Sequence, residues 1–362
     1  MKSSKRMLAV LLSLLLLVGV CGIGPVASAE ADSKTASILC YNVAGLPNLN
    51  YYLGKEDGVD VQGNQYQLGR LLNEEDYAFI AVQEDFTFHH ALVEGLDAYP
   101  YKTEHSGGVP GGDGLNYFSK TPVYNTKRTT WDQLYGVIDD GADEMTPKGI
   151  LYACIDLGDG ILVDVYNIHA DAYGDEGSQA AREDNFRQLA AMIQANSNDR
   201  PVIVTGDFNA SIHQWDDDGL YEILYQGCGL KDAWVELHNG GNYEDFSYWE
   251  ETVGGGWPDY WGVWDSLEKF LYRDGGGIHI EANSFGYKDY LNAKGESISD
   301  HKAAEVTFTF TKTDDFKENT QDLAVTRVTK WKYILRRILI FFEDLFKVFR
   351  HWDEAKQYVG LK

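Results

Sequence analysis

The residues with the clearest chemical potential stand where apolar segments of the chain begin or end. Asp207 and Asn209 follow the apolar run 202–204, whose pattern predicts a short buried strand. Asp300 and His301 precede a segment in which apolar and polar residues alternate, which predicts another strand. Carboxylates hold hard divalent cations, an amide donates to a phosphate oxygen, and a histidine oriented by an acid activates water. The sequence therefore predicts metal-assisted attack of water on a phosphate ester.

Short apolar segments that alternate with loops and a few helices between residues 37 and 311 must position these side chains. The segments with a strand pattern are Ser37–Val43, Ala78–Gln83, Asn116–Ser119, Ile150–Leu157, Ile161–Ile168, Pro201–Thr205, Lys269–Arg273 and Ala303–Thr311. Those with helical spacing are Gln65–Asn73, His90–Gly95 and Ser178–Ala195. No internal repeat and no obvious domain break precedes residue 312, so the pattern favours one α+β domain built on layered sheets.

Five further motifs join the two already described. They are Tyr41–Pro47, Val82–Asp85, Gly112–Asn116, Lys148–Leu151 and Tyr166–Ala172. Together with Gly-Asp-Phe-Asn and Ser-Asp-His, their order along the chain resembles the endonuclease/exonuclease/phosphatase superfamily. That group includes DNase I-like nucleases, neutral sphingomyelinases and inositol-phosphate 5-phosphatases. The resemblance covers the chain from about residue 36 to 312.

The resemblance implies a DNase I-like fold, which is a four-layer α/β/β/α sandwich with its site at one edge. It also implies catalysis supported by Mg²⁺ or by another divalent cation such as Mn²⁺ or Ca²⁺. By position in the motifs, the metal-binding residues would be Glu84, Asn42, Asp207 and Asp300. Carboxylate and amide oxygens are the ligand atoms that such hard cations prefer.

The resemblance assigns catalytic roles in the same way. His169 would donate to the phosphate and stabilise the charged transition state or protonate the leaving group. Asn209 would hold a phosphoryl oxygen, and Asp207 would orient the attacking water or bind the metal. His301 would be the general base, while Asp300 would fix its tautomer or contribute to the metal site.

Three more residues are secondary candidates. Asp171 lies two residues past His169, on the same side of an extended segment, and either contributes to phosphate binding or caps a loop. Lys148 either reaches the phosphate or is a solvated lysine at the start of a strand. Glu268 stands where many members of the superfamily carry Asp, and its extra methylene bears on the positioning of any histidine that it supports.

The charge of the chain is unevenly distributed. The total is −25, and because residues 1–29 carry +3 and residues 325–362 carry +5, the body from 30 to 324 carries −33. An acidic body repels a polyanion, since affinity for nucleic acid comes chiefly from cationic contacts with phosphates. A neutral or zwitterionic head group tolerates such a body, whereas nucleic acid and polyphosphorylated head groups are disfavoured.

The two ends of the chain differ from its body. Residues 1–29 combine a basic start, an apolar run and a small-residue cleavage site, which predicts a secretory signal peptide and a secreted protein. The catalytic domain would span residues 30–312, followed by a polar linker at 313–329. Residues 330–362 contain a basic amphipathic helix that suits a membrane interface, with docking on its own domain or on a partner left open.

The cysteines do not predict a disulfide scaffold. After the signal peptide the chain retains Cys40, Cys154 and Cys228. The first two lie in apolar, strand-like runs and are expected to be buried free thiols, although one disulfide remains open.

Charge and aromatic content favour a lipid among the possible phosphate esters. The loop 257–264 and the C-terminal helix supply aromatic residues of the kind that enter a lipid interface. We therefore expect a secreted sphingomyelinase- or phospholipase C-like phosphodiesterase that acts at a phospholipid surface, peripheral on the membrane and without an obligate protein partner. Two alternatives stay open: an extracellular DNase I-like endonuclease, and a non-catalytic membrane- or host-binding module on the same fold.

Overall fold

The computed structural model describes most of the predicted catalytic domain. The described residues are 32–56, 58–108, 112–136, 143, 146–210, 219–244, 267–319 and 322–325. The predicted signal peptide, the predicted C-terminal helix at 330–362 and the aromatic loop 257–264 lie outside them.

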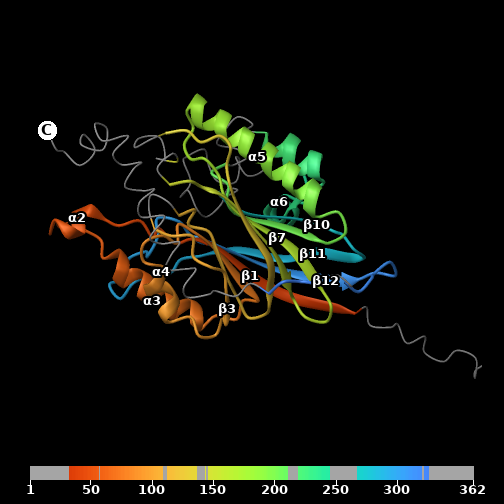
Figure 1. The fold of residues 1–362 in the computed structure, drawn as a ribbon, viewed down its shortest axis with the longest axis horizontal. Helices are drawn as coiled ribbons and strands as arrows, with labels where there is room; N and C mark the ends of the chain where they lie inside the picture. Colours follow the sequence, from red (N-terminus) through yellow and green to blue (C-terminus); the bar gives the residue numbers. More distant parts are fainter. Residues whose placement is uncertain are drawn as a thin grey trace, which may run out of the picture. The chain divides into compact units, whose positions relative to one another are not determined.

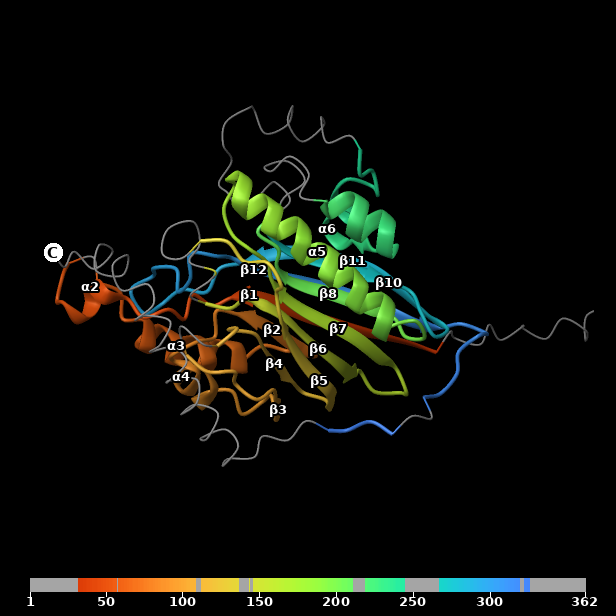
Figure 2. The ribbon, with the colours of Figure 1, turned by 45° about the horizontal axis from the view of Figure 1, so that its top comes forward.

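Two six-stranded sheets form the centre of the fold (Figures 1 and 2). The first sheet has the order β11 (Ile278–Lys288), β12 (Ala303–Lys312), β1 (Ser33–Asn42), β2 (Phe79–Gln83), β4 (Asn116–Ser119) and β3 (Tyr101–Lys102). The second has the order β5 (Val123–Thr130), β6 (Gly149–Asp156), β7 (Leu162–His169), β8 (Val202–Asp207), β10 (Glu268–Arg273) and β9 (Lys231–Asp232).

Helices cover the outer face of each sheet (Figure 2). The first sheet carries α3 (Val61–Asn73) and α4 (His89–Glu94), and α2 (Leu49–Tyr52) precedes them in the chain. The second carries α5 (Glu176–Asn196) and the π-helical turn η2 (Leu220–Gln226), with α6 (Ala233–His238) next to β10. Three buried apolar clusters fill the three interfaces between these layers. The fold is thus the predicted four-layer α/β/β/α sandwich.

The position of each strand in its sheet explains its residue pattern. The central strands β6 and β7 are buried on both faces and accordingly read as nearly continuous apolar runs. In β12, by contrast, buried and partly exposed residues alternate along much of the strand. All eight predicted strands and the three predicted helices are confirmed, with ends displaced by up to four residues.

The sequence patterns missed several elements. The edge strand β5 is polar along most of its length, so its formation depends on pairing with β6 and not on apolar periodicity. β11 carries exposed or partly exposed residues along most of its length, and it pairs with β12 through a bulge near Ala282. The short α2 and α6 rest on local caps, at Asn48 and Asp232 respectively.

Two parallel strand pairs place the candidate residues at one edge of the sandwich. β1 runs parallel to β2, and β7 runs parallel to β8, so the carboxyl ends of each pair lie together. Asn42 and Glu84 stand at the first pair of ends, and His169 and Asp207 pair in register at the second. β10 starts antiparallel to β8, with Glu268 opposite Asp207.

The structure also bears on the cysteines, the predicted linker and membrane-spanning helices. Cys40, Cys154 and Cys228 are all buried and free, as expected for the first two. Part of the predicted linker pairs with the edge strand β5, where Val325 forms a bridge with Tyr124. Among the described residues, no helix has the length and apolar character needed to span a bilayer.

Candidate active site

Asn42 is the residue on which the site converges. It is fully buried at the end of β1, and its Nδ2 donates to Glu84 Oε1 at 3.0 Å and to Asp207 Oδ2 at 3.1 Å. The same amide lies 3.4 Å from Nε2 of His301. One side chain from the first sheet thus joins two carboxylates and an imidazole that come from both sheets.

Glu84 has an unusual backbone conformation at the end of β2. Its φ is +55°, in the left-handed region that non-glycine residues seldom adopt. Neighbouring hydrogen bonds hold this conformation, because Gly45 N donates to the Glu84 carbonyl and Asp85 N donates to the Gly114 carbonyl. Burial raises the pKa of the Glu84 carboxyl, against the opposing effects of Asn42 and His301.

Asp207 and His169 lie side by side at the ends of β8 and β7. His169 Nε2 is 3.4 Å from Asp207 Oδ2, and both side chains are almost fully buried. Burial acts to raise the pKa of Asp207, but the nearby charges of His301 and Lys148 outweigh it and hold that pKa below its ordinary value. Burial and the charge of Lys148 lower the pKa of His169 well below its ordinary value, so its ring is neutral at pH 7.

His301 is oriented by Glu268. Its Nδ1 contacts the buried Glu268 carboxylate and lies 3.9 Å from Asp207 Oδ2, while its backbone N–H donates to Ser299 Oγ. Burial alone would lower the pKa of His301, but Glu268 and Asp207 raise it to about 10. In the neutral ring with Nδ1–H directed at Glu268, Nε2 is the atom left to accept a proton.

The expected role of Asp300 in fixing this tautomer falls instead to Glu268. Asp300 is exposed, and its carboxylate acts on His301 through its charge. The sequence marks Glu268 as a support for a histidine, and its contact with Nδ1 at the start of β10 identifies that histidine as His301. A metal-binding role for Asp300 remains a prediction.

Asn209 follows β8 in a tight turn. Its φ is +48°, and its backbone N–H donates to Asp207 Oδ1 at 3.0 Å. Its Nδ2 donates to the Ala170 carbonyl at 3.0 Å, next to His169. The partly buried amide therefore lies beside the Asp207–His169 pair. This position is compatible with its predicted contact to a phosphoryl oxygen.

A buried ion pair that the sequence did not indicate lies close to these residues. Lys148 Nζ is 2.5 Å from Asp143 Oδ1, and both side chains are nearly inaccessible to solvent. Burial acts to lower the pKa of Lys148, but Asp143, Asp207 and Glu84 together raise it. Lys148 thus contributes a fixed positive charge near the site carboxylates. No pattern marks Asp143, because its segment lacks strand or helix periodicity.

Asp171 is buried within a loop. Its Oδ2 accepts a hydrogen bond from Tyr135 N at 2.8 Å, and its backbone N–H donates to Asn185 Oδ1 at 3.0 Å. Burial and the neighbouring Asp143 raise the pKa of Asp171 to about 8. These contacts fit the loop-capping alternative, and a phosphate-binding role for Asp171 remains a prediction.

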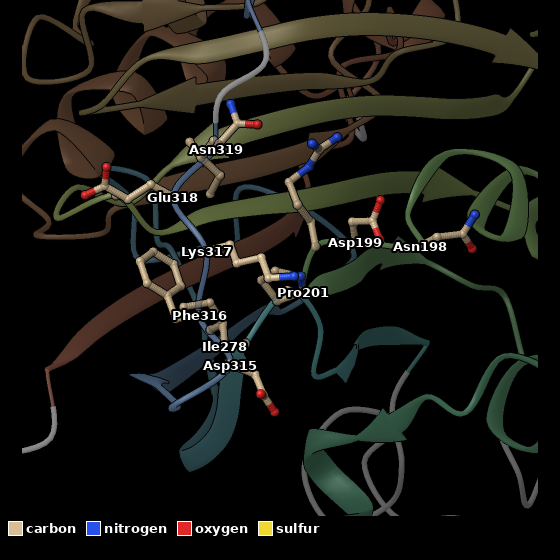
Figure 3. Close-up of a pocket in the computed structure, with 14 residues that line it drawn as sticks. Asn198, Asp199, Pro201, Ile278, Asp315, Phe316, Lys317, Glu318 and Asn319 are labelled. Atoms are coloured by element: carbon tan, nitrogen blue, oxygen red, sulfur yellow. The ribbon is translucent and has the colours of Figure 1, made fainter.

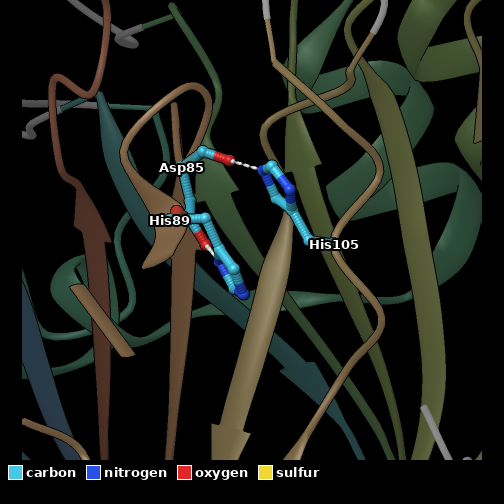
Figure 4. Close-up of side chains that lie close together, drawn as sticks. All are labelled: Asp85, His89 and His105. Carbon is cyan, nitrogen blue, oxygen red and sulfur yellow. Dashed lines mark hydrogen bonds and ion pairs between the residues drawn. The ribbon is translucent and has the colours of Figure 1, made fainter. Parts of the chain in front are cut away.

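A second cluster of acid and histidine side chains lies behind Glu84 (Figure 4). Asp85 Oδ2 contacts His89 Nδ1 at 2.5 Å and accepts from Asn116 Nδ2 at 2.7 Å, while His105 Nε2 bonds the Asp85 carbonyl at 2.9 Å. The two imidazoles stack with centroids 4.3 Å apart and planes at 8°. One ligand atom from each of the three side chains lies within 4.8 Å of the others, so a metal ion is also compatible with the cluster. The cluster also holds the backbone next to Glu84.

A cavity of about 450 Å³ lies away from these residues (Figure 3). Its lining includes Pro201, Ile278 and Phe316. Pro201 immediately precedes β8, whereas Asp207 ends it, and a six-residue strand spans roughly 20 Å. The cavity therefore belongs to the opposite end of the sandwich from the candidate site.

The donor set of the candidate site fits a hard divalent cation. Glu84 and Asp207 each accept a hydrogen bond from the Asn42 amide, so two carboxylates converge at one point. Burial raises the pKa of the partly buried Glu84 carboxyl, and the charge of a bound cation would act in the opposite direction. Glu84 and Asp207 would hold the ion, with Asn42 positioning both, and oxygen ligands of this kind suit Mg²⁺, Mn²⁺ or Ca²⁺.

Known proteins share the sequence family and the fold of this chain. The Endonuclease/Exonuclease/phosphatase family matches residues 39–301 of the chain. A sphingomyelinase of Mycobacterium tuberculosis (strain ATCC 25618 / H37Rv) is 34% identical over 295 residues, covering 77% of this chain and 54% of the relative. The chain thus spans about half the length of the curated relatives that it matches.

Solved structures share the fold at low sequence identity. Humanized D. rerio TDP2 superposes with a TM-score of 0.55 at 16% identity, covering 76% of this chain and 98% of TDP2. A beta toxin mutant from Staphylococcus aureus with bound magnesium ions has a TM-score of 0.51 at 15% identity, covering 75% and 99%. At these identities the likeness shows the fold alone.

Proposed function

The chain belongs to the Endonuclease/Exonuclease/phosphatase family, and on that premise we propose that it is a secreted, divalent-metal-dependent phosphodiesterase of the sphingomyelinase type. The observation that carries the proposal is the convergence of Asn42, Glu84, Asp207, His169 and His301 at one edge of the sandwich. The 34% identity to a mycobacterial sphingomyelinase supports the choice of substrate.

Each side chain of the site has its own role in the proposed reaction. His301, oriented by Glu268 through Nδ1, would take a proton from water at Nε2. A cation held by Glu84 and Asp207 would neutralise phosphate charge, and its own charge would lower the pKa of His301 from about 10 toward the range of a general base. The neutral His169 and the Asn209 amide would donate to phosphoryl oxygens as negative charge develops.

The acidic body supports a lipid over a nucleic acid as substrate. Residues 30–324 carry a net charge of −33, and the buried Lys148 is already paired with Asp143. Binding a polyanion needs several cationic contacts, whereas a zwitterionic phosphocholine group needs few. Export through the predicted signal peptide would bring the enzyme to the outer surface of membranes.

The test is phosphocholine release from sphingomyelin and phosphatidylcholine vesicles, measured with Mg²⁺ and with EDTA, while plasmid DNA is digested in parallel. We expect Mg²⁺-dependent release from sphingomyelin, no release in EDTA, and intact DNA. Cleaved DNA with untouched lipid would assign the chain to the nuclease alternative. No turnover of either substrate would favour the non-catalytic module.

A further inference from the structure

Exposed apolar side chains gather in one short part of the chain. Among the described residues, twelve large apolar side chains are exposed, and seven of them lie between positions 46 and 66. The seven are Leu46, Leu49, Tyr51, Tyr52, Leu53, Val59 and Tyr66. Single exposed apolar residues are ordinary on a protein surface, but a concentration of this kind marks a contact surface.

Helix α2 presents the densest part of this segment. None of its residues is buried, and Tyr52 and Leu53 are each 60% exposed. In both ribbon views α2 stands outside the helices that cover the first sheet (Figures 1 and 2). Its shape comes from local bonds, since Asn48 Oδ1 accepts from Tyr51 N and Leu49 O accepts from Leu53 N. The helix is therefore formed without packing its apolar side chains on the domain.

The segment is directly connected to the candidate active site. Leu49 follows Asn42 by seven residues, which span at most about 24 Å when fully extended. The intervening chain is fixed, because Gly45 N donates to the Glu84 carbonyl and Gln65 Nε2 donates to the Val43 carbonyl. Any partner surface that binds α2 therefore also lies near the edge of the sandwich where the site residues converge.

The residue types indicate what that surface is. Leucine offers apolar bulk, and tyrosine joins an apolar ring to a polar hydroxyl, a combination enriched where hydrocarbon meets water. Lys55 is the one basic residue between positions 46 and 66, where Glu56, Asp57 and Asp60 are acidic. An anionic membrane attracts clustered basic residues, which this segment lacks. A zwitterionic surface suits it better.

We propose that the seven exposed apolar side chains between positions 46 and 66, led by those of α2, insert into the interface of a zwitterionic phospholipid bilayer and seat the active site over the lipid head groups. This inference rests on the proposed function for the identity of the substrate. It assigns the membrane contact to the described domain itself, in addition to any contact made by the aromatic loop or the C-terminal helix.

The first experiment compares Y52S/L53S with L237S, which replaces a 37%-exposed leucine on α6. Co-sedimentation with phosphatidylcholine–sphingomyelin vesicles is measured in EDTA, so that binding is separated from turnover. We expect the double variant to lose about 10-fold or more in vesicle affinity and L237S to bind like the wild type. Hydrolysis of a soluble chromogenic phosphodiester, measured with Mg²⁺, should be unchanged in both variants. Equal vesicle binding by the double variant and the wild type would overturn the proposal.

The second experiment reports where residue 53 lies. L53C and the control L237C, in the protein from residue 30 onward, are labelled with an environment-sensitive NBD group, which is selective because the three cysteines that the structure describes are buried. Vesicles should shift the emission of the label at 53 to the blue and leave the label at 237 unchanged. Vesicle binding without that shift would place the contact elsewhere. A label at 53 that is already shielded without vesicles would show that another part of the chain or a second copy covers α2, which also overturns the proposal.

The inference and the proposed function fail in different ways. If α2 binds vesicles but the wild type releases no phosphocholine, the inference stands and the proposed function falls. If the wild type releases phosphocholine while Y52S/L53S binds and hydrolyses vesicles equally well, the function stands and the inference falls.

Discussion

The described residues contain two clusters of histidines and carboxylates, and the clusters differ in how their polar atoms are bonded. In the first, His301 contacts the side chains of Glu268 and Asp207, and its Nε2 faces the Asn42 amide. In the second, His105 bonds a backbone carbonyl and stacks on His89. The first arrangement leaves a nitrogen that can exchange a proton, whereas the second secures a loop.

The pKa values of the two imidazoles are shifted in opposite directions, although His105 is buried and His301 is mostly so. The surrounding carboxylates raise the pKa of His301 to about 10. Burial, with the neighbouring His89, lowers the pKa of His105 to about 3. Residue type therefore does not decide whether a buried histidine is chemically useful. What decides it is whether nearby carboxylates outweigh the cost of burying the charged ring.

Removing one imidazole from each cluster should give the largest difference in activity between the two clusters. His301→Ala should reduce phosphodiester hydrolysis by about 10²–10⁴-fold, because it removes the proposed general base, and it should also lower stability, because the contact with the buried Glu268 is lost. His105→Ala should cost about 1–3 kcal/mol of unfolding free energy and much less activity. Turnover assays and thermal unfolding measure both. Activity near the wild-type level in His301→Ala would refute the site assignment.

A second comparison uses the adjacent acids Glu84 and Asp85. Glu84→Gln should weaken Mg²⁺ binding, because it removes the charge of a proposed metal ligand. The loss should be at least ~10–100-fold, which is the loss caused by mutating a residue that only supports a ligand. Asp85→Asn should change Mg²⁺ affinity less and should lower stability, since Asp85 bonds His89 and Asn116. Calorimetric titration with Mg²⁺ and thermal unfolding distinguish the two outcomes. Equal losses of Mg²⁺ affinity would mean that both acids serve the metal.

The smallest effect is the pH dependence of each histidine in the metal-free protein. For His301, whose folded pKa of about 10 exceeds the ordinary histidine value of 6.5, the contribution to stability is full below pH 6.5 and is lost as the pH rises to about 10. For His105, with a folded pKa of about 3, the contribution is present above pH 6.5 and is lost as the pH falls to about 3.

Nuclear magnetic resonance titration of the imidazole carbons in EDTA measures both pKa values, with His301→Ala and His105→Ala supplying the assignments. Saturating Mg²⁺ should then lower the His301 value and leave that of His105 in place. A His301 pKa near 6.5 in EDTA would show that Glu268 and Asp207 do not act on it as their distances indicate.

The sequence by itself determined the frame of this protein. The central strands are covered on both faces, so their apolar runs are visible without a structure, and β6, β7 and β8 were predicted to within two residues at each end. The motif residues that end these strands, Asp207 and His169, follow from the same patterns. Edge elements such as β5 and the loop that carries Asp143 have no such periodicity, because pairing and burial with distant segments stabilise them.

Tertiary structure alone decided which partners the site residues have. Ser-Asp-His suggests that Asp300 orients His301, yet the register of β10 with β8 brings Glu268, thirty-three residues earlier, onto Nδ1. The single amide of Asn42 joins Glu84 and Asp207 because the two sheets pack face to face. Sequence patterns record which face of a strand is apolar, whereas the distance between two side chains on different sheets is set only when the layers close on one another.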